Sequence, residues 1–387
     1  MPYLDHAASA PVHPEVLRAM WPYLAGGPAN PSSRHEAGRT AAAALDWARD
    51  QIATALGGRP GEVVLTAGGT EADNLAVKGI ALARPRGRRI LTSPTEHPAV
   101  LESCRALARL AGFTVEMLPV DGAGRVRADD VATALDAGEP AALVTVATAS
   151  SELGTVQPIR QIAAVAAARG VPMHTDAVQA AGQIPVSMTD LGVDALTVAG
   201  HKLGAPAGVG ALLVRRSVPL EPVLHGGGQQ DGRRSGTEDV AGAIGLAVAL
   251  HLATTGLAER TARLEERRDR LAAAVAARLP GTDLVGDPVR RLPGHLAWLL
   301  PGVTSEAVLL RLDERGVQVS SGTACAADST EPPEALLACG IDADLARTMV
   351  RVSFGAQTSE EELETVADEL VEAVHALSGT AGAPASG

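Results

Sequence analysis

A lysine follows directly after an apolar segment that predicts a buried strand. The segment Ala195–Val198 leads into Ala199, Gly200, His201 and Lys202, and small residues continue beyond the lysine. A lysine at the end of a buried strand is costly while charged, because burial disfavours the ammonium form. The neutral amine is a nucleophile that forms an imine with a carbonyl compound. The stretch alone is more typical of a surface lysine in a loop, so the other motifs have to decide.

A glycine-rich turn follows the predicted strand Glu62–Thr66. Gly69 and Thr70 stand there at the start of a predicted helix. Glycine lets the backbone approach an anion closely, and the positive N-terminus of the helix and a threonine hydroxyl favour phosphate. No Gly-Lys-Ser/Thr follows, so the turn is not a P-loop. An ordinary strand-to-helix turn capped by threonine explains the same residues equally well.

Two further polar residues stand at strand exits. His97 follows the predicted strand Arg89–Thr92, where a histidine can stack on a planar ligand or move protons. Asp176 follows the predicted strand Val171–His174. A carboxylate can hold a pyridinium nitrogen protonated, which is what lets pyridoxal phosphate act as an electron sink. Each residue is unremarkable alone, but the interpretation of Asp176 as a functional residue is strengthened because Lys202 ends the next strand.

Two loops downstream also carry candidate residues. The segment His225–Thr237 is rich in glycine and arginine, and its Ser-Gly-Thr end suits contact with phosphate. Cys325 stands in a loop of polar and small residues with little to bury it, which favours a reactive role. Cys104 and Cys339 stand in helical segments and are expected to be structural.

Composition excludes several classes of function. The formal net charge is −12 and aromatic residues make up 2%, which argues against direct nucleic-acid binding. No segment reaches the roughly 20 apolar residues of a membrane span, and no signal peptide is visible. Three scattered cysteines predict neither a disulfide framework nor a metal site. We therefore expect a cytoplasmic protein with no metal and no membrane contact.

Strand-like and helical segments alternate through the first two thirds of the chain, which predicts an α/β fold with a mostly parallel sheet. The helix at about Ser33–Leu56 is expected to stop at Gly57 and Gly58. The strands expected in this sheet are Glu62–Thr66, Arg89–Thr92, Thr114–Leu118, Ala141–Ala147, Val171–His174, Ala195–Val198 and Val209–Val214.

The pattern changes in the last third, which predicts a smaller α+β domain. Its expected strands are His295–Leu300, Val317–Ser320 and Val350–Phe354, and its last helix is Ser359–Leu377, opened by a capping box. The predicted organisation is an N-terminal arm at 1–15 that packs with the small domain, a large domain at 16–255, the small domain at 256–377, and a disordered tail at 378–387.

Taken together, the motifs resemble the NifS/IscS-like cysteine desulfurases, the class V branch of the fold-type I pyridoxal-phosphate enzymes. The resemblance covers Tyr3 to about His375 and implies the fold-type I architecture, with a seven-stranded sheet in the large domain. The motifs that carry it, in family order, are Tyr3-Leu4-Asp5-His6-Ala7-Ala8, Asn30-Pro31-Ser32-Ser33, Gly69-Thr70-Glu71-Ala72, Glu96-His97-Pro98, the Asp176 and Lys202 segments, Arg234-Ser235-Gly236-Thr237-Glu238, and Ser320-Ser321-Gly322-Thr323-Ala324-Cys325.

The resemblance implies a role for each matching residue. Lys202 is expected to bind pyridoxal 5'-phosphate covalently, with Asp176 on the pyridine nitrogen. Gln179 contacts the phenolic oxygen and His97 stacks on the ring. The phosphate is expected against Gly69, Thr70 and His201, with Thr237 contributed by the second subunit of a homodimer. Ser151 stands where relatives have an asparagine that contacts cofactor and substrate, and Arg351 matches the arginine that binds the substrate carboxylate.

The implied reaction converts L-cysteine to L-alanine. Lys202 takes the Cα proton, and Cys325 attacks the substrate sulfur and becomes a persulfide, which passes to a sulfur-acceptor protein. The implied use of the sulfur is tRNA thiolation, iron–sulfur assembly or a dedicated biosynthetic pathway. Two alternatives remain open at this point. One is a selenocysteine lyase or another C–S lyase, and the other is a sulfur-relay scaffold without turnover.

Four positions depart from the family pattern. Ala199 replaces a serine that contacts the phosphate, and Ser151 replaces the asparagine. Ala207 stands in place of a lysine, and Ala356 in place of an arginine. A lost hydrogen bond typically costs about 1 kcal/mol, so weaker retention of the cofactor is expected.

Overall fold

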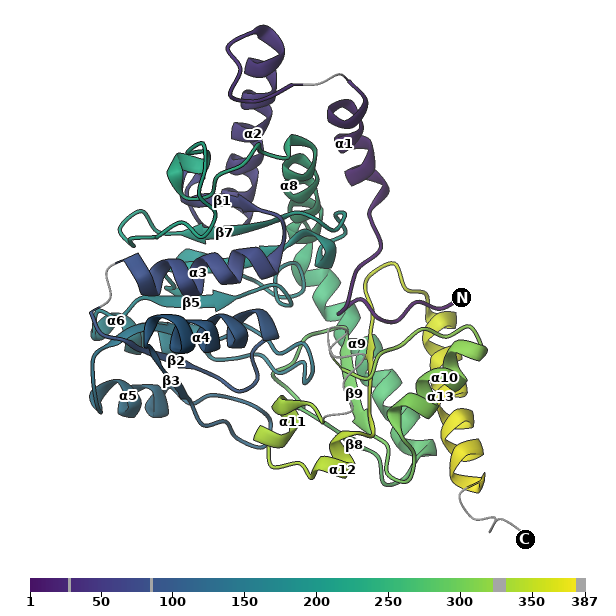
Figure 1. Ribbon diagram of the computed structural model, residues 1–387. Helices are drawn as coiled ribbons and strands as arrows, with labels where there is room; N and C mark the ends of the chain where they lie inside the picture. The colour runs from purple at the N-terminus through teal and green to yellow at the C-terminus, as the bar shows by residue number, and fades with distance from the viewer. Residues whose placement is uncertain (27–28, 84–85, 323–331, 381–387) are drawn as a thin grey trace.

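The computed structural model describes residues 1–26, 29–83, 86–322 and 332–380. Its larger sheet has seven strands in the order β1-β7-β6-β5-β4-β2-β3 (Figure 1). Six of them run parallel and β7 runs against both neighbours, so the predicted mostly parallel sheet is confirmed. The strands are β1 (Val63–Thr66), β2 (Arg89–Thr92), β3 (Thr114–Met117), β4 (Ala141–Thr145), β5 (Met173–Asp176), β6 (Ala195–Ala199) and β7 (Gly210–Val214).

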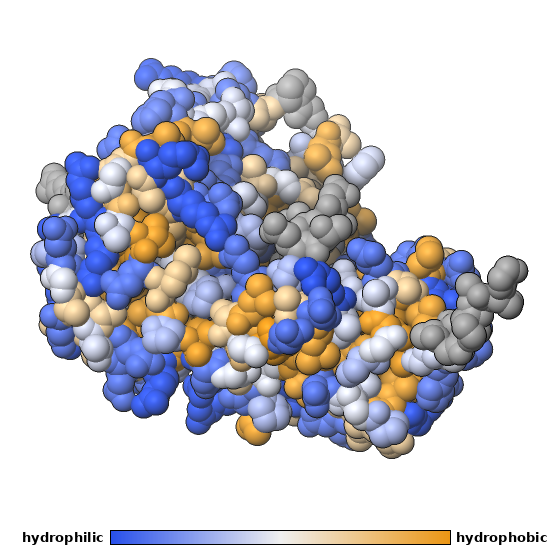
Figure 2. All heavy atoms as spheres, turned by 60° about the horizontal axis from the view of Figure 1, so that its bottom comes forward, coloured by the Kyte–Doolittle hydropathy of each residue, from blue (hydrophilic) through white to orange (hydrophobic). Residues whose placement is uncertain are grey.

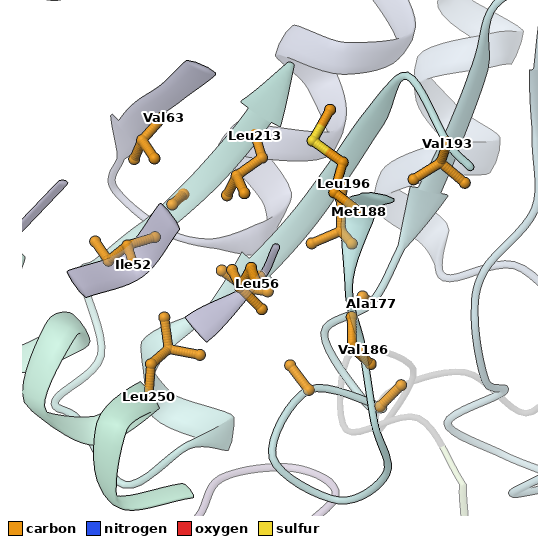
Figure 3. Packing of buried hydrophobic residues seen from close by; sticks show 14 of the residues in the cluster. Ile52, Leu56, Val63, Ala177, Val186, Met188, Val193, Leu196, Leu213 and Leu250 are labelled. Carbon is orange, nitrogen blue, oxygen red and sulfur yellow. The ribbon is translucent and has the colours of Figure 1, made fainter. Parts of the chain in front are cut away.

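Helices cover both faces of this sheet, which explains why every residue of β4, β6 and β7 is buried. On one face α3 (Gly69–Ala83) packs against α4 (Pro98–Ala111). On the other face α2 (Glu36–Ala55) packs against α8 (Val240–Thr254), which also contacts α1 (Pro14–Ala25). Figure 3 shows this second core, where side chains of α2 and α8 meet those of β1, β6 and β7. With few aromatic residues, alanine, valine and leucine do the packing.

Helix α2 ends as predicted but begins later. Gly57 takes φ +65° and the Gly58 amide donates to the Ala53 carbonyl at 2.9 Å, which closes the helix in a Schellman turn. The helix starts at Glu36, three residues after the predicted start, because the His35 side chain accepts from the Gly38 amide and acts as the N-cap.

A second sheet has three antiparallel strands, β8 (Asp283–Leu284), β9 (His295–Leu299) and β10 (Met349–Ser353). The predicted strand Val317–Ser320 is wrong, because that segment makes only isolated bridges, from Gln318 to Tyr3 and from Ser320 to Arg351. Strand β8 was not predicted, since two residues give no readable alternation. The helices here are α9 (Leu257–Arg278), α10 (Ser305–Glu314), α11 (Glu334–Ala338), α12 (Ala343–Ala346) and α13 (Glu360–Thr380).

The predicted capping box of the last helix is confirmed. The Ser359 amide donates to the Glu362 carboxylate at 2.7 Å, and the Glu362 amide donates to the Ser359 hydroxyl at 3.1 Å. Helix α13 continues to Thr380, so the first residues of the predicted disordered tail are helical. Residues 381–387 lie outside the described residues.

The N-terminal arm bridges the two sheets. Leu4 is fully buried, and its amide and carbonyl bond to Gln318 and Ser353 at 2.8 Å each. Farther along the arm, the Ala10 amide donates to the His201 carbonyl at 2.7 Å and the His13 amide donates to the Gly204 carbonyl at 2.9 Å. The arm therefore connects β10 of the small sheet to the loop that carries Lys202.

The surface seen from below carries hydrophilic residues over most of its extent, interrupted by smaller apolar patches (Figure 2). Within the described ranges, no single helix is long and apolar enough to cross a membrane, and the pair α8 and α9, which passes by length and composition, is bent by 71°.

The remaining short elements are helix α5 (Ala128–Asp136), helix α6 (Ile159–Ala168), helix α7 (Met188–Leu191), and the 3₁₀ turns η1 (Pro60–Glu62), η2 (Gly200–Lys202) and η3 (Gln230–Gly232).

Candidate functional site

One cavity of about 680 Å³ collects most of the predicted site residues at the carboxyl ends of β4, β5 and β6. The carboxyl ends of parallel strands meet at one edge of a sheet, so side chains distant in sequence converge there. The predicted site residues that line the cavity are Gly69, Thr70, His97, Ser151, Asp176, Gln179, His201, Lys202 and Arg351. Ala199 and Ala207, two of the departures from the family pattern, line it as well.

Lys202 is held in the cavity by the N-terminal arm. Its Nζ donates to the Ala7 carbonyl at 2.5 Å and to the Ala8 carbonyl at 2.7 Å. The Gln179 side chain donates to the same Ala7 carbonyl at 3.0 Å. The turn that presents the lysine needs glycine, because a Cβ at Gly200 would meet the Val209 side chain at 2.8 Å. The arm and the η2 turn together aim the amine into the cavity.

Asp176 is a buried carboxyl at the end of β5. It is 7% exposed, and its Oδ1 accepts from the Val178 amide at 2.8 Å. Burial raises the pKa of Asp176, while His97 and Lys202 act in the opposite direction. The cavity thus holds a buried carboxyl with which a cationic group of a ligand can pair.

Two more buried acids, Glu96 and Asp73, interact electrostatically with Asp176. Burial raises the pKa of Glu96 to about 8, and its Oε1 accepts from the Ser93 hydroxyl and the Ala147 amide at 2.7 and 2.9 Å. Burial and Asp176 raise the pKa of Asp73 well above its ordinary value. With a pKa of about 8, the Glu96 carboxyl is mostly neutral near pH 7, and the proximity of Asp73 to Asp176 disfavours a charge on both at once.

His97 is the N-cap residue of α4. Its Nδ1 accepts from the Ala99 amide at 3.1 Å, which fixes the plane of the ring. Burial lowers the pKa of His97, an effect that Asp176 partly offsets, so the imidazole is neutral near pH 7. Burial, together with the nearby Lys202 and His97, lowers the pKa of His201 to about 4. Two neutral histidines therefore flank Lys202.

The turn before α3 forms a cradle of backbone groups. The Ala67 amide donates to the Glu71 carboxylate at 2.7 Å, and Arg234 pairs with the same carboxylate at 2.6 Å, so the turn is rigid. A Cβ at Gly69 would come within 3.0 Å of the Val178 side chain, so glycine allows the helix start to pack against the strand ends. The N-terminus of α3, with Thr70 beside it, suits a phosphate group.

Arg351 lies on β10 and is 1% exposed. Its Nη2 donates to Asp5 Oδ1 at 2.7 Å and its Nη1 donates to the Ser151 carbonyl at 3.1 Å. Its Nε is buried without a hydrogen-bond partner among the described residues. Ser151 therefore contributes its carbonyl to the site. A buried guanidinium with an unsatisfied N–H at a cavity wall suits an anionic ligand group such as a carboxylate.

Two predicted residues lie elsewhere. Thr237 is exposed and does not line the cavity of its own chain, so its role toward a second subunit stays a prediction. Cys325 lies outside the described residues. The segment just before it is anchored at the site, because Ser320 and Arg351 exchange backbone hydrogen bonds at 3.1 and 2.6 Å.

Sequence reasoning missed the roles of Asp5, Ala7 and Ala8. Their motif was recognised, but the contacts of Ala7 and Ala8 are made by carbonyl groups, which no residue type encodes. The buried acids Asp73 and Glu96 were missed as well. In the described ranges, no cluster of three or more His, Cys, Asp or Glu could hold a metal ion.

Comparisons with known proteins agree with this geometry. The family model described as aminotransferase class-V matches residues 2–366. The chain is 45% identical over 379 residues to a Mycobacterium tuberculosis protein described as "IscS-like cysteine desulfurase", covering 97% of this chain and 96% of that one. The chain belongs to the class V aminotransferases, in their NifS/IscS-like cysteine desulfurase branch.

Two solved structures share the fold. A "NIFS-LIKE PROTEIN" superposes with a TM-score of 0.88 at 31% identity, covering 96% of this chain and 99% of that chain. A structure described as "SspA in complex with cysteine" superposes with a TM-score of 0.80 at 33% identity, covering 93% and 100%.

Enzymes of this family use pyridoxal phosphate, and the residues of the cavity fit it. A buried carboxyl at Asp176 matches a protonated ring nitrogen, and the N-terminus of α3 with Thr70 matches a phosphate. The Lys202 amine stands in the same cavity. Bound there, the cofactor supplies an electron sink for reactions at the α-carbon of an amino acid.

Proposed function

We propose that this protein is a pyridoxal-phosphate-dependent cysteine desulfurase. It takes L-cysteine, releases L-alanine, and carries the sulfur as a persulfide on Cys325. The observation that carries the proposal is the placement of Lys202, Asp176 and Arg351 around one cavity. The comparisons support the choice of substrate, because a relative at 45% identity is described as a cysteine desulfurase and a structural relative as a complex with cysteine.

Arg351 binds the carboxylate of the substrate amino acid in this proposal. Its guanidinium is held on two sides by Asp5 and the Ser151 carbonyl, and its Nε has no protein partner among the described residues. A guanidinium held in this way loses little freedom when the substrate binds. The substrate is thereby oriented with its α-carbon toward the Lys202 side of the cavity.

Lys202 moves the proton of the substrate α-carbon. The amine is flanked by His97 and His201, whose low pKa values keep them neutral and thus poor competitors for a proton. Asp176 would pair with the ring nitrogen of the cofactor, and His97 and Lys202 favour the charged form of its carboxyl. The division of roles follows from the distribution of charge around the cavity.

Cys325 takes the sulfur. Its thiolate attacks the sulfur of the bound cysteine, an S–S bond forms, and the bond between that sulfur and the substrate β-carbon breaks. The electron pair stays with the carbon fragment, which takes up a proton and leaves as alanine. A thiolate of an acceptor protein then attacks the outer sulfur of the persulfide, the S–S bond to Cys325 breaks, and the Cys325 thiolate leaves.

We propose further that the active protein is a cytoplasmic homodimer, in which Thr237 completes the phosphate site of the second subunit. The support is that Thr237 is exposed and absent from the cavity of its own chain, while its neighbours Glu238 and Arg234 are tied to Arg49 and Glu71. The sulfur acceptor serves tRNA thiolation, iron–sulfur assembly or a dedicated biosynthetic pathway.

Product analysis tests the reaction directly. Purified protein with pyridoxal phosphate, cysteine and a dithiol reductant is expected to form alanine and sulfide in equal amounts, because each turnover releases one of each. Alanine is the expected carbon product because the carbon fragment keeps its amino group. Amino-acid analysis and a sulfide assay on the same samples measure both products. Formation of pyruvate and ammonia in place of alanine would show an elimination reaction and contradict the proposal.

Asp5 is expected to position Arg351 for the substrate. The Asp5→Asn variant keeps the shape of the side chain but removes the charge that holds Nη2, so we expect KM for cysteine to rise roughly tenfold with little change in kcat. Steady-state kinetics measures the two constants separately. Asp46→Asn is the matched control, because the Asp46 side chain is 75% exposed in its pair with Arg49 and such pairs contribute little. A lower KM in Asp5→Asn would mean that Asp5 competes with the substrate and would contradict the positioning role.

A further inference from the structure

A second large cavity, of about 700 Å³, lies away from the proposed active site and shares no lining residue with it. It is lined by the first residues of α5 and α6, by the turn before α5, and by the segment 289–291. Helices α5 and α6 pack against each other at this place (Figure 1). Nothing in the proposed desulfurase reaction uses these residues.

Arginines dominate the wall of this cavity. Five of them line it against two aspartates, in a chain whose net charge is −12. The five are Arg125, Arg127, Arg160, Arg290 and Arg291. The sign of the local charge is therefore opposite to that of the whole protein, which favours an anionic ligand at this position.

The carboxylates nearby leave much of this charge uncompensated. Asp129 stands 3.8 Å from Arg127, and Asp287 stands 4.0 Å from Arg125. The second aspartate of the wall, Asp121, uses its Oδ1 to accept from the backbone amides of its own turn. In the part of the chain that the structure describes, Arg160, Arg290 and Arg291 form no ion pair within 4.0 Å, and Asp287 acts on Arg290 and Arg291 only at longer range.

Arg291 is the most buried of these groups. It is 3% exposed, and its Nη2 donates to the carbonyls of Leu153 and Val285 at 3.4 and 3.2 Å. Its Nε and Nη1 are buried without a hydrogen-bond partner among the described residues. A buried guanidinium with two unsatisfied nitrogens is costly, and an anion in the adjoining cavity reduces that cost.

Two helix N-termini add to the positive potential. Helix α5 follows Arg127 and helix α6 follows Pro158, and neither N-terminus is capped by a side chain. Both of these residues line the cavity. In α6 the amides of Ile159, Gln161 and Ile162 already donate to the carbonyls of Gln157 and Pro158, so this N-terminus contributes mainly the positive end of the helix dipole. Asp129 and Asp130 occupy the first turn of α5, so α6 contributes the stronger of the two.

We propose that this cavity binds a small molecule that carries a phosphate group. The phosphate lies against Arg160, Arg290 and the N-terminus of α6, where planar guanidinium groups can bind two oxygens at once. The apolar part of the ligand lies on Val156, Ile184 and Leu191, which line the same cavity. The volume falls within the range of small-molecule sites, which favours a compact ligand over an extended acidic peptide.

Binding of inorganic pyrophosphate and ADP to the holoenzyme tests the proposal. The protein is first saturated with pyridoxal phosphate, so that its phosphate cradle at α3 is filled. Isothermal titration at fixed ionic strength then measures both affinities. We expect both probes to bind, and ADP to bind more tightly because its adenosine part can reach the apolar residues. The proposal would be overturned if pyrophosphate or ADP fails to bind, or if ADP binds no more tightly than pyrophosphate.

Variants locate the binding. The double variant Arg160→Ala, Arg290→Ala changes two exposed side chains and is expected to weaken pyrophosphate binding about tenfold or more. Arg263→Ala, an exposed arginine on α9, is the control and should leave the affinity unchanged. Equal affinity in the double variant and wild type would place the anion elsewhere. Stronger binding of a glutamate-rich peptide than of either probe would also overturn the proposal, in favour of an acidic protein partner.

Discussion

Replacing Lys202 with alanine is expected to lower the rate of alanine formation by roughly 10³-fold or more, because the variant lacks both the anchoring amine and the base for the α-carbon proton. The variant should still fold, since the Lys202 side chain lines the cavity and does not belong to the hydrophobic core. Single-turnover measurement of alanine, with the visible spectrum of the bound cofactor recorded on the same sample, tests the effect.

The chain offers a matched control for this experiment. It contains two lysines, Lys78 and Lys202. Lys78 stands on α3 and does not itself line the cavity, although it donates at 2.6 Å to the Oδ1 of Asn74, which does. Lys78→Ala is therefore expected to keep the wild-type rate and spectrum. A Lys202→Ala variant that retains both would show that another group performs the chemistry.

Replacing Cys325 with alanine is expected to abolish sulfur transfer while leaving cofactor binding intact. The other two cysteines cannot take over, because burial raises the pKa of Cys104 to about 12 and that of Cys339 to about 11. At pH 7.5 fewer than about one in a thousand of either would be thiolate. We expect transfer of radiolabelled sulfur from cysteine to the protein to fall at least about 100-fold in Cys325→Ala.

Cys339→Ala is the control for this loss and should keep wild-type labelling, since Cys339 is partly exposed but lies outside the cavity. The outcome also separates the alternative functions. Alanine formation that continues at the wild-type rate in Cys325→Ala would identify a lyase, in which the sulfur leaves without a persulfide on the enzyme. If the wild-type protein forms no alanine, the result would favour a sulfur-relay scaffold without turnover.

The convergence of Asp176 and Lys202 could be predicted from the sequence, because both follow directly on strand patterns. Parallel strands present their carboxyl ends at one edge, so spacing along the chain translates into proximity in space. The turn at Gly69 and the cap at His97 follow from the same rule, as each stands where a strand gives way to a helix. These motifs depend on residues that are close together in the sequence, so they can be predicted without knowledge of the tertiary contacts.

The pairing of Asp5 with Arg351 could not be predicted, because 346 positions separate the two residues. The contact depends on the path of the N-terminal arm across β10, where Leu4 is buried and bonded on both sides. No periodicity in the arm encodes that path. The contacts between Lys202 and the carbonyls of Ala7 and Ala8 could not be predicted for the same reason.

The small sheet shows a different limit. Val317–Ser320 has the composition of a strand, yet its residues divide their contacts between Tyr3 of the arm and Arg351 of β10. Pairing with two different segments prevents a continuous ladder, so tertiary context overrides β propensity. Strand β8 is only two residues long and exists because Leu284 pairs with Trp298 of β9.

The central claim is that Lys202 is the amine that holds the cofactor. Borohydride reduction of the holoenzyme, followed by proteolysis and mass spectrometry of the peptides, tests it directly, since reduction makes the bond between lysine and cofactor permanent. We predict that the pyridoxyl group is found on the peptide that contains Lys202 and is absent from that containing Lys78. A label on Lys78, or no labelled lysine in a yellow holoenzyme, would contradict the assignment.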